Sequence, residues 1–140
     1  MELAAFEGLW TLTRTIEDIS AGQRGRFLGT ARLTPTPGGL AYVEEGRLTL
    51  AAAPPMAASR RYLWRAAGAA IEIDFEDGRF FHAFPAAEPR PEASHFCDPD
   101  HYAVRYDFTP WPDWRAEWRV TGPRKDYRMV SDYRRGGVAD

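Results

Sequence analysis

The stretch SHFCDPDHY, residues 94–102, gathers side chains that can ligate metals, transfer protons or act as nucleophiles. It contains His95, His101 and the only cysteine, Cys97, with two aspartates between them. The third histidine of the chain, His82, lies upstream. On a strand, His95 and Cys97 would point to the same side, because side chains alternate between the two faces. These residue types allow metal binding, proton transfer or nucleophilic catalysis. The residues around them favour some of these chemistries over others.

A metal site is the first hypothesis, because His, Cys and Asp side chains are all metal ligands. The stretch contains neither a Cys-x-x-Cys pair nor a His-x-x-x-His pair, so its spacing matches no structural zinc motif. We therefore predict no metal ligands, and the sequence leaves any cofactor unknown. A haem protein that uses His82 or His95 as the iron ligand stays open as an alternative.

Catalysis is the second hypothesis. Cys97 with a nearby His and Asp would satisfy the logic of a nucleophilic triad, but no Gly-rich oxyanion loop follows it. An enzyme that uses His82 or His95 as an acid–base group is the better catalytic alternative. No catalytic residue can be assigned, and whether the protein is an enzyme stays open.

A polar turn is the simplest hypothesis for the same stretch. Asp98-Pro99-Asp100 suits a type I turn, with Asp at the first position and Pro at the second. His101 would then lie on the solvent side. We favour a turn at the mouth of a cavity, with His95 facing inward and Cys97 as a further option.

The composition favours one compact domain that spans residues 1–140. The 18 basic and 20 acidic residues are scattered and give a net charge of −2, which argues against nucleic-acid binding. The chain shows no signal peptide and no run long enough to span a membrane, and a single cysteine fits a reducing compartment. We therefore expect a cytoplasmic protein without a membrane partner. Its oligomeric state stays open, a homodimer included.

Short runs of alternating apolar and polar residues, separated by Gly and Pro turns, predict strands along the whole chain. The predicted strands cover residues 10–16, 27–33, 40–50, 60–65, 71–75, 80–84, 102–108, 114–120 and 127–133. The segment from Pro85 to Pro91 is the one long loop that we expect.

A hairpin around Asp77-Gly78 is the most specific local prediction, because Asp-Gly between alternating runs favours a two-residue turn. That turn pairs Phe75 with Phe80, Ile73 with His82, and Ile71 with Phe84. The inner face would carry these apolar residues and His82, whereas Glu72, Asp74, Glu76 and Arg79 would face outward.

About eight to ten strands joined by short turns predict an all-β fold, an antiparallel up-and-down barrel. Closing the sheet removes its edges, and a barrel of about eight strands is either filled or holds one small ligand. A two-sheet sandwich is the alternative architecture.

Gly8-Leu9-Trp10 at the start of the first strand resembles the Gly-x-Trp signature of lipocalins and their calycin relatives. The resemblance implies a lipocalin-like barrel whose Trp closes one end. It also implies that an arginine of the last strand packs across this Trp, and Arg134 or Arg128 could do so.

The chain also resembles, nearly end to end, an uncharacterised family of short bacterial proteins that carry a domain of unknown function. That resemblance implies no activity. In the pattern of that family His95, Cys97 and Asp100 recur, whereas His101 does not, which weakens any metal site that needs His101. The resemblance rests on residues 10–14, 42–46, 61–64, 75–82, 95–97, 100, 102, 118–127 and 131–134.

Polar side chains that share the alternation of the apolar ones are the candidate site, because burying a polar group needs a partner or a ligand. Internal pairing is one explanation: Arg14 or Arg60 could form a salt bridge with Glu44, and His82 could form a hydrogen bond with a neighbouring Tyr. The other is a ligand site, in which arginine and lysine side chains bind a carboxylate or phosphate. We predict a small, partly apolar ligand, with an anionic group as a further option, in a cavity of aromatic residues. The predicted contacts are Arg14, Glu44, Tyr62, His82, His95 and Lys125.

Overall fold

A computed structural model describes residues 1–136 of the chain as one antiparallel sheet of ten strands. A short 3-10 helix, η1 (Leu3–Phe6), precedes the sheet. The strands are β1 (Gly8–Asp18), β2 (Gln23–Thr36), β3 (Gly39–Leu50), β4 (Met56–Ala67), β5 (Ala70–Phe75), β6 (Phe80–Pro85), β7 (Glu92–Cys97), β8 (Asp100–Asp107), β9 (Trp114–Gly122) and β10 (Lys125–Arg135). Among residues 1–136, no helix is long and apolar enough to cross a membrane.

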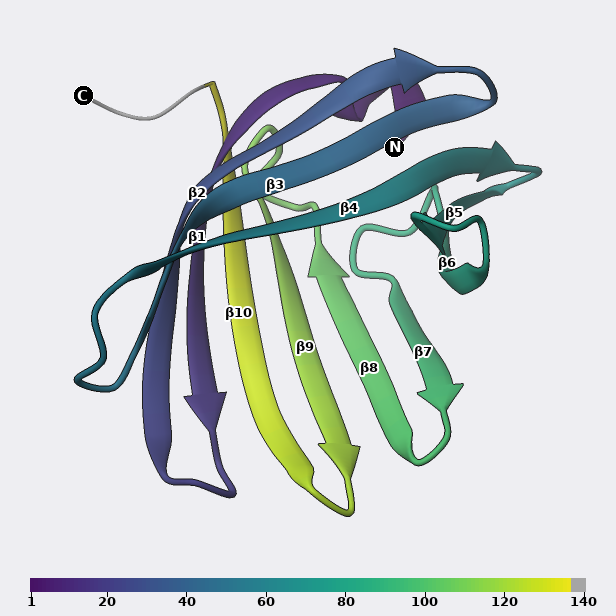
Figure 1. Cartoon of the computed structure of the whole chain (residues 1–140). Helices are drawn as coiled ribbons and strands as arrows, with labels where there is room; N and C mark the ends of the chain where they lie inside the picture. Colours follow the sequence, from purple (N-terminus) through teal and green to yellow (C-terminus); the bar gives the residue numbers. More distant parts are fainter. Residues whose placement is uncertain (137–140) are drawn as a thin grey trace.

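The sheet curls into a nearly closed barrel. Its strand order is β6-β5-β4-β3-β2-β1-β10-β9-β8-β7, so neighbours in sequence are neighbours in space and the first strand pairs with the last. β6 and β7 end this order and contact each other, which brings the two edges of the sheet together (Figure 1). The predicted all-β, up-and-down, lipocalin-like barrel is therefore confirmed, and the long loop between Pro85 and β7 is present as expected.

The long strands β2 and β3 bend strongly along their length (Figure 1), and Gly29 lies opposite Gly46 where the two strands pair. A Cβ at Gly29 would lie 2.0 Å from the carbonyl oxygen of Glu45, and one at Gly46 would lie 2.3 Å from that of Leu28. Only glycine allows the two backbones this approach, and such glycine positions are where sheets turn a barrel corner.

One end of the barrel is closed by aromatic side chains around η1. Phe6 packs with ring centroids 5.1–5.5 Å from those of Trp64, Phe108, Trp111 and Trp114. Trp10 is fully buried, and its indole N–H donates to the carbonyl oxygen of Phe6 at 2.9 Å. Trp10, the tryptophan of the Gly-x-Trp signature, thus holds η1 against the closed end of the barrel.

The arginine that covers Trp10 is Arg135, so the expectation of Arg134 or Arg128 was wrong. Its guanidinium carbon lies 3.8 Å from the Trp10 ring centroid, and its N–H groups donate to the carbonyl oxygens of Glu7 and Ala5. The reason is register, because β1 and β10 place Arg135 directly opposite Trp10.

The hairpin between β5 and β6 differs from the prediction in one half. Ile73 pairs with His82 and Ile71 with Phe84 as expected, but Asp74 pairs with Phe80 because a β-bulge follows Ile73. Phe80 is therefore 52% exposed, whereas Phe81 turns inward and is 5% exposed. A longer turn causes this shift. The N–H of Phe75 donates to the carbonyl oxygen of Arg79, so the turn between these two residues contains more than the two residues expected.

Candidate functional site

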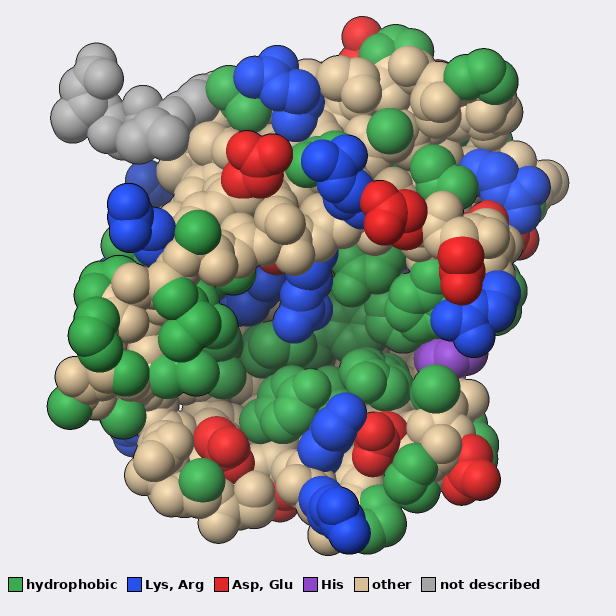
Figure 2. Space-filling view, in the orientation of Figure 1, with side chains coloured by type: hydrophobic (Ala, Val, Ile, Leu, Met, Phe, Trp, Pro, Cys, Tyr) green, Lys and Arg blue, Asp and Glu red, His purple; other side chains and the backbone are tan. Residues whose placement is uncertain are grey.

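A cavity of about 550 Å³ occupies the barrel interior on the side away from η1 and opens to solvent. Figure 2 shows a hollow with hydrophobic side chains at its base and charged side chains at its rim. Aromatic rings form most of the wall, and they come from β3 to β6 and from β8 to β10. They are Tyr42, Tyr62, Trp64, Phe75, Phe80, Phe81, Tyr102, Tyr106, Trp114, Trp118, Tyr127 and Tyr133.

The cavity brings together five of the six predicted contact residues: Arg14, Glu44, Tyr62, His82 and His95. The sixth, Lys125, is not among the described residues that line it. Its ammonium group forms an ion pair with Asp100 at 2.9 Å, and this hydrogen bond raises the pKa of Lys125.

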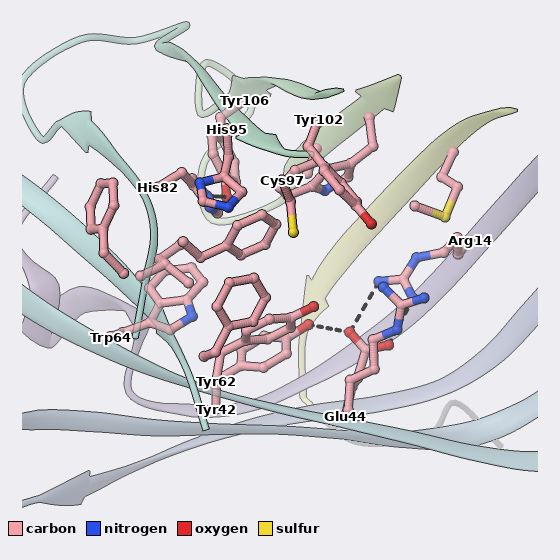
Figure 3. Close-up of a pocket in the computed structure, with 18 of the residues that line it drawn as sticks. Arg14, Tyr42, Glu44, Tyr62, Trp64, His82, His95, Cys97, Tyr102 and Tyr106 are labelled. Atoms are coloured by element: carbon pink, nitrogen blue, oxygen red, sulfur yellow. Dashed lines mark hydrogen bonds and ion pairs between the residues drawn. The ribbon is translucent and has the colours of Figure 1, made fainter. Parts of the chain in front are cut away.

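Arg14 and Glu44 form a buried ion pair on one wall (Figure 3). Two guanidinium N–H groups donate to the two carboxylate oxygens at 2.7 and 3.0 Å, and a third donates to the hydroxyl of Ser131 at 2.7 Å. The hydroxyl of Tyr42 donates to Glu44 at 2.7 Å and lies 2.8 Å from the hydroxyl of Tyr133. The internal pairing that the sequence allowed is therefore present for Arg14.

Both charges of this pair persist over a wide pH range. Burial disfavours the charged guanidinium, but the hydrogen bonds and charge of Glu44 outweigh burial and raise the pKa of Arg14. Burial likewise favours the protonated carboxyl, yet Arg14 and the Tyr42 hydroxyl hold the pKa of Glu44 below its ordinary value. Burial raises the pKa of Tyr133 to about 12.

His82 and Tyr106 form a second buried pair, on the β6 and β8 side of the cavity. The Nε2 atom of His82 lies 2.7 Å from the Tyr106 hydroxyl, and the other ring nitrogen, Nδ1, is buried with no partner among the described residues. Burial, with a smaller contribution from His95, lowers the pKa of His82 to about 3. His82 is therefore neutral at physiological pH, which makes it a poor general acid at that pH.

Phe81 covers His82 and connects opposite walls of the cavity. Its ring stacks between those of Tyr62 and Trp118, with centroid distances of 5.8 and 5.4 Å. It also meets the imidazole of His82 edge-on at 4.6 Å. The bulge in β6 is what turns this ring inward, and bulges often re-aim side chains beside functional sites.

Three arginines line the cavity, and they differ in their partners. Arg14 is paired with Glu44, and Arg79 donates to Asp77 at 2.7 Å. Arg60 is exposed at the mouth and has no hydrogen-bond or ion-pair partner among the described residues. It is therefore the lining cation that remains available to a bound anion.

The stretch SHFCDPDHY forms the hairpin of β7 and β8 at the cavity mouth. His95 and Cys97 both line the cavity, and Figure 3 shows the Cys97 sulfur directed into it near Tyr102. His101 is exposed, as the turn hypothesis expected. The turn itself is not type I: Cys97 pairs with Asp100, and the Asp98–Pro99 bond between them is cis. Within residues 1–136 no three His, Cys, Asp or Glu side chains are grouped to hold a metal ion.

Several residues of the site were not predicted from the sequence. Ser131 and Tyr133 share the alternation of β10 with Met129, so a parity argument on that strand could have found them. Phe81 could not be found this way, because only the bulge brings it inside.

A protein-family model described as a family of unknown function, DUF6314, matches residues 6–135. Among solved structures, the S-type phycobiliprotein lyase CPES from Guillardia theta is similar with a TM-score of 0.66 and 10% sequence identity. That alignment covers 98% of this chain and 92% of the lyase. A redesigned β-barrel, mFAP1, bound to DFHBI, has a TM-score of 0.44 and 13% identity, over 95% of this chain and 97% of that one. The search of curated proteins gave no match.

Proposed function

The chain belongs to this family of unknown function, DUF6314, and we propose that it binds a small, partly apolar molecule with an anionic group inside the barrel. The observation that carries the proposal is the open, aromatic-walled cavity of about 550 Å³. Pockets of about 300–1,000 Å³ with apolar walls and a few placed polar groups are typical ligand sites. The likeness to the lyase concerns the fold alone, and the proposal rests on the cavity.

The anionic group is inferred from the charges that line the cavity. The Arg14–Glu44 pair is neutral as a whole, and His82 is neutral at physiological pH. Arg60 lies opposite Glu44 and interacts with its charge at a distance, but it forms no ion pair or hydrogen bond with a described residue, so it adds a positive charge at the mouth. An anion at this position would meet a guanidinium that can bind a carboxylate, sulfonate or phosphate through two hydrogen bonds.

Cys97 provides a native reporter for the experiment, because it is the only cysteine and lines the cavity. The probe is anilinonaphthalene sulfonate, an aromatic anion. We expect one probe molecule to bind per chain and to slow alkylation of Cys97 by N-ethylmaleimide at least fivefold.

The matched control moves the thiol to the outer face of the same strand, in the double variant C97S/S94C. Ser94 is exposed and alternates with His95 and Cys97, so a thiol there points away from the cavity. Bound probe should leave its alkylation rate unchanged. Equal protection of both thiols, or none at Cys97 under saturating probe, would contradict binding in the cavity.

A further inference from the structure

The barrel interior has buried hydrogen-bonding capacity at His82 and Tyr106 that the protein itself does not use. Both residues are buried, at 2% and 3% exposure, and one hydrogen bond joins them. The pair carries two polar hydrogens, one on the neutral imidazole and one on the hydroxyl. A single hydrogen bond uses one of them, so the other lacks an acceptor in either tautomer.

A second unused donor lies in the same part of the cavity. The indole N–H of Trp114 is buried with no partner among the described residues, and Trp114 also lines the cavity. Its ring centroid is 6.3 Å from that of Tyr106. Native structures rarely leave such groups unpaired, so each one indicates a missing partner, either water or a ligand atom.

His82 and Arg60 lie at different positions along the strands. His82 pairs with Ile73, and Ile73 pairs with Trp64, so His82 belongs to the row of Trp64 across the sheet. Arg60 precedes Trp64 by four residues on β4, which is about 13 Å along a strand at about 3.3 Å per residue. The cavity therefore has a cationic mouth and a neutral, hydrogen-bonding interior, with stacked aromatic rings between them.

We propose that the ligand is an elongated aromatic anion with a neutral oxygen at the end opposite its charge, and that His82, Tyr106 and Trp114 bind this oxygen. This inference rests on the proposed function and adds the class of ligand and its orientation. A hydroxyl or carbonyl oxygen of the ligand accepts hydrogen bonds from the unused donors. In its other tautomer the His82–Tyr106 pair can also accept a hydrogen bond from a ligand hydroxyl. The flat body of the ligand lies against Phe81 and its stacked neighbours.

The test compares two probes that share an aromatic body and a carboxylate, 2-naphthoate and 6-hydroxy-2-naphthoate. We expect the hydroxylated probe to bind at least fivefold more tightly to the wild-type protein. The double variant H82F/Y106F removes both polar groups together while keeping an aromatic ring at each position, so neither group of the pair is left without its partner. In this variant the preference should be largely lost, because of the three proposed groups only the Trp114 N–H remains. The surface variant H101F, which also replaces a histidine by phenylalanine, should keep the preference.

A second readout separates ligand binding from a structural role of His82. The nitrogen-15 resonance of its Nδ1 atom should shift when 6-hydroxy-2-naphthoate binds and stay in place with 2-naphthoate. Equal affinities in the wild type, or an undiminished preference in H82F/Y106F, would overturn the inference. Failure of both naphthoates while anilinonaphthalene sulfonate still binds would also overturn it and leave the proposed function standing. Failure of all three probes would overturn both.

Discussion

Two buried polar clusters face the same cavity, and they differ in how completely they are satisfied. Arg14 and Glu44 share two hydrogen bonds, with Ser131, Tyr42 and Tyr133 completing the network around them. His82 and Tyr106 share one hydrogen bond and leave Nδ1 of His82 without a partner among residues 1–136. The first cluster thus needs nothing from a ligand, whereas the second can still bind one.

This difference separates structural polar groups from those that a ligand can use. Burial alone does not distinguish them, because Glu44 and His82 are both 2% exposed. The two clusters are distinguished by how many of their hydrogen-bond donors and acceptors are left unpaired. We therefore expect the Arg14–Glu44 cluster to affect mainly stability, and the His82–Tyr106 cluster together with Arg60 to affect mainly binding.

The largest expected effect comes from breaking the satisfied cluster. Glu44→Gln removes the charge that compensates Arg14, which leaves a buried guanidinium unpaired. Breaking a buried ion pair in this way costs about 3–5 kcal/mol, so we expect the free energy of unfolding in urea to fall by that amount. The exposed neighbour Glu45 gives the control, E45Q, which should change stability by less than about 0.5 kcal/mol. A similar small loss for E44Q would mean that this cluster is not structural.

The pH dependence of stability sharpens the same comparison. Because burial lowers the pKa of His82 from 6.5 to about 3, the unfolded chain binds this proton more readily than the folded one. The contribution of neutral His82 to the free energy of unfolding is therefore fully present above about pH 6.5. It falls as the pH decreases toward 3, and about 2 kcal/mol is lost at pH 5. Glu44 has a lowered pKa, so its contribution persists at pH 5 and is lost only below about 4.5.

Urea unfolding at pH 7 and pH 5 measures this effect. The double variant H82F/Y106F should lose most of the difference between the two pH values, whereas H101F should keep it. An unchanged pH dependence in H82F/Y106F would show that His82 is not the group responsible.

A smaller effect is expected at the closed end of the barrel, away from both clusters. Arg135→Ala removes the guanidinium that stacks on Trp10 and donates to two carbonyl oxygens, which should cost about 1–2 kcal/mol in thermal unfolding. The adjacent Arg134→Ala should cost less, because Arg135 is the one that contacts Trp10. Probe binding should be the same in both variants, and a weaker affinity in R135A would show that the closed end also shapes the cavity.

The fold was predictable because alternation of side chains is a local property of each strand. It placed Arg14, Glu44 and His82 inside, and all three are buried. The Gly-x-Trp signature likewise identified the closed end. These predictions needed no knowledge of which strands meet across the barrel.

The partners of those residues were not predictable, because they depend on register and on turn length. Either Arg14 or Arg60 could have paired with Glu44, and only the side-chain geometry in the barrel decides for Arg14. The two-residue turn expected at Asp77-Gly78 put Phe80 inside, whereas the longer turn selects Phe81 instead.

Isothermal titration with two probes of the same aromatic body tests the central claim, that the cavity binds an aromatic anion through Arg60. Anilinonaphthalene sulfonate carries a charge, and N-phenyl-naphthylamine lacks it. We predict that the wild-type protein and R61Q, a variant of the adjacent arginine that pairs with Glu76 at 3.7 Å, prefer the anion about tenfold, or about 1.4 kcal/mol. In R60Q this preference should disappear. A preference that persists in R60Q, or that is absent from the wild type, would contradict the account.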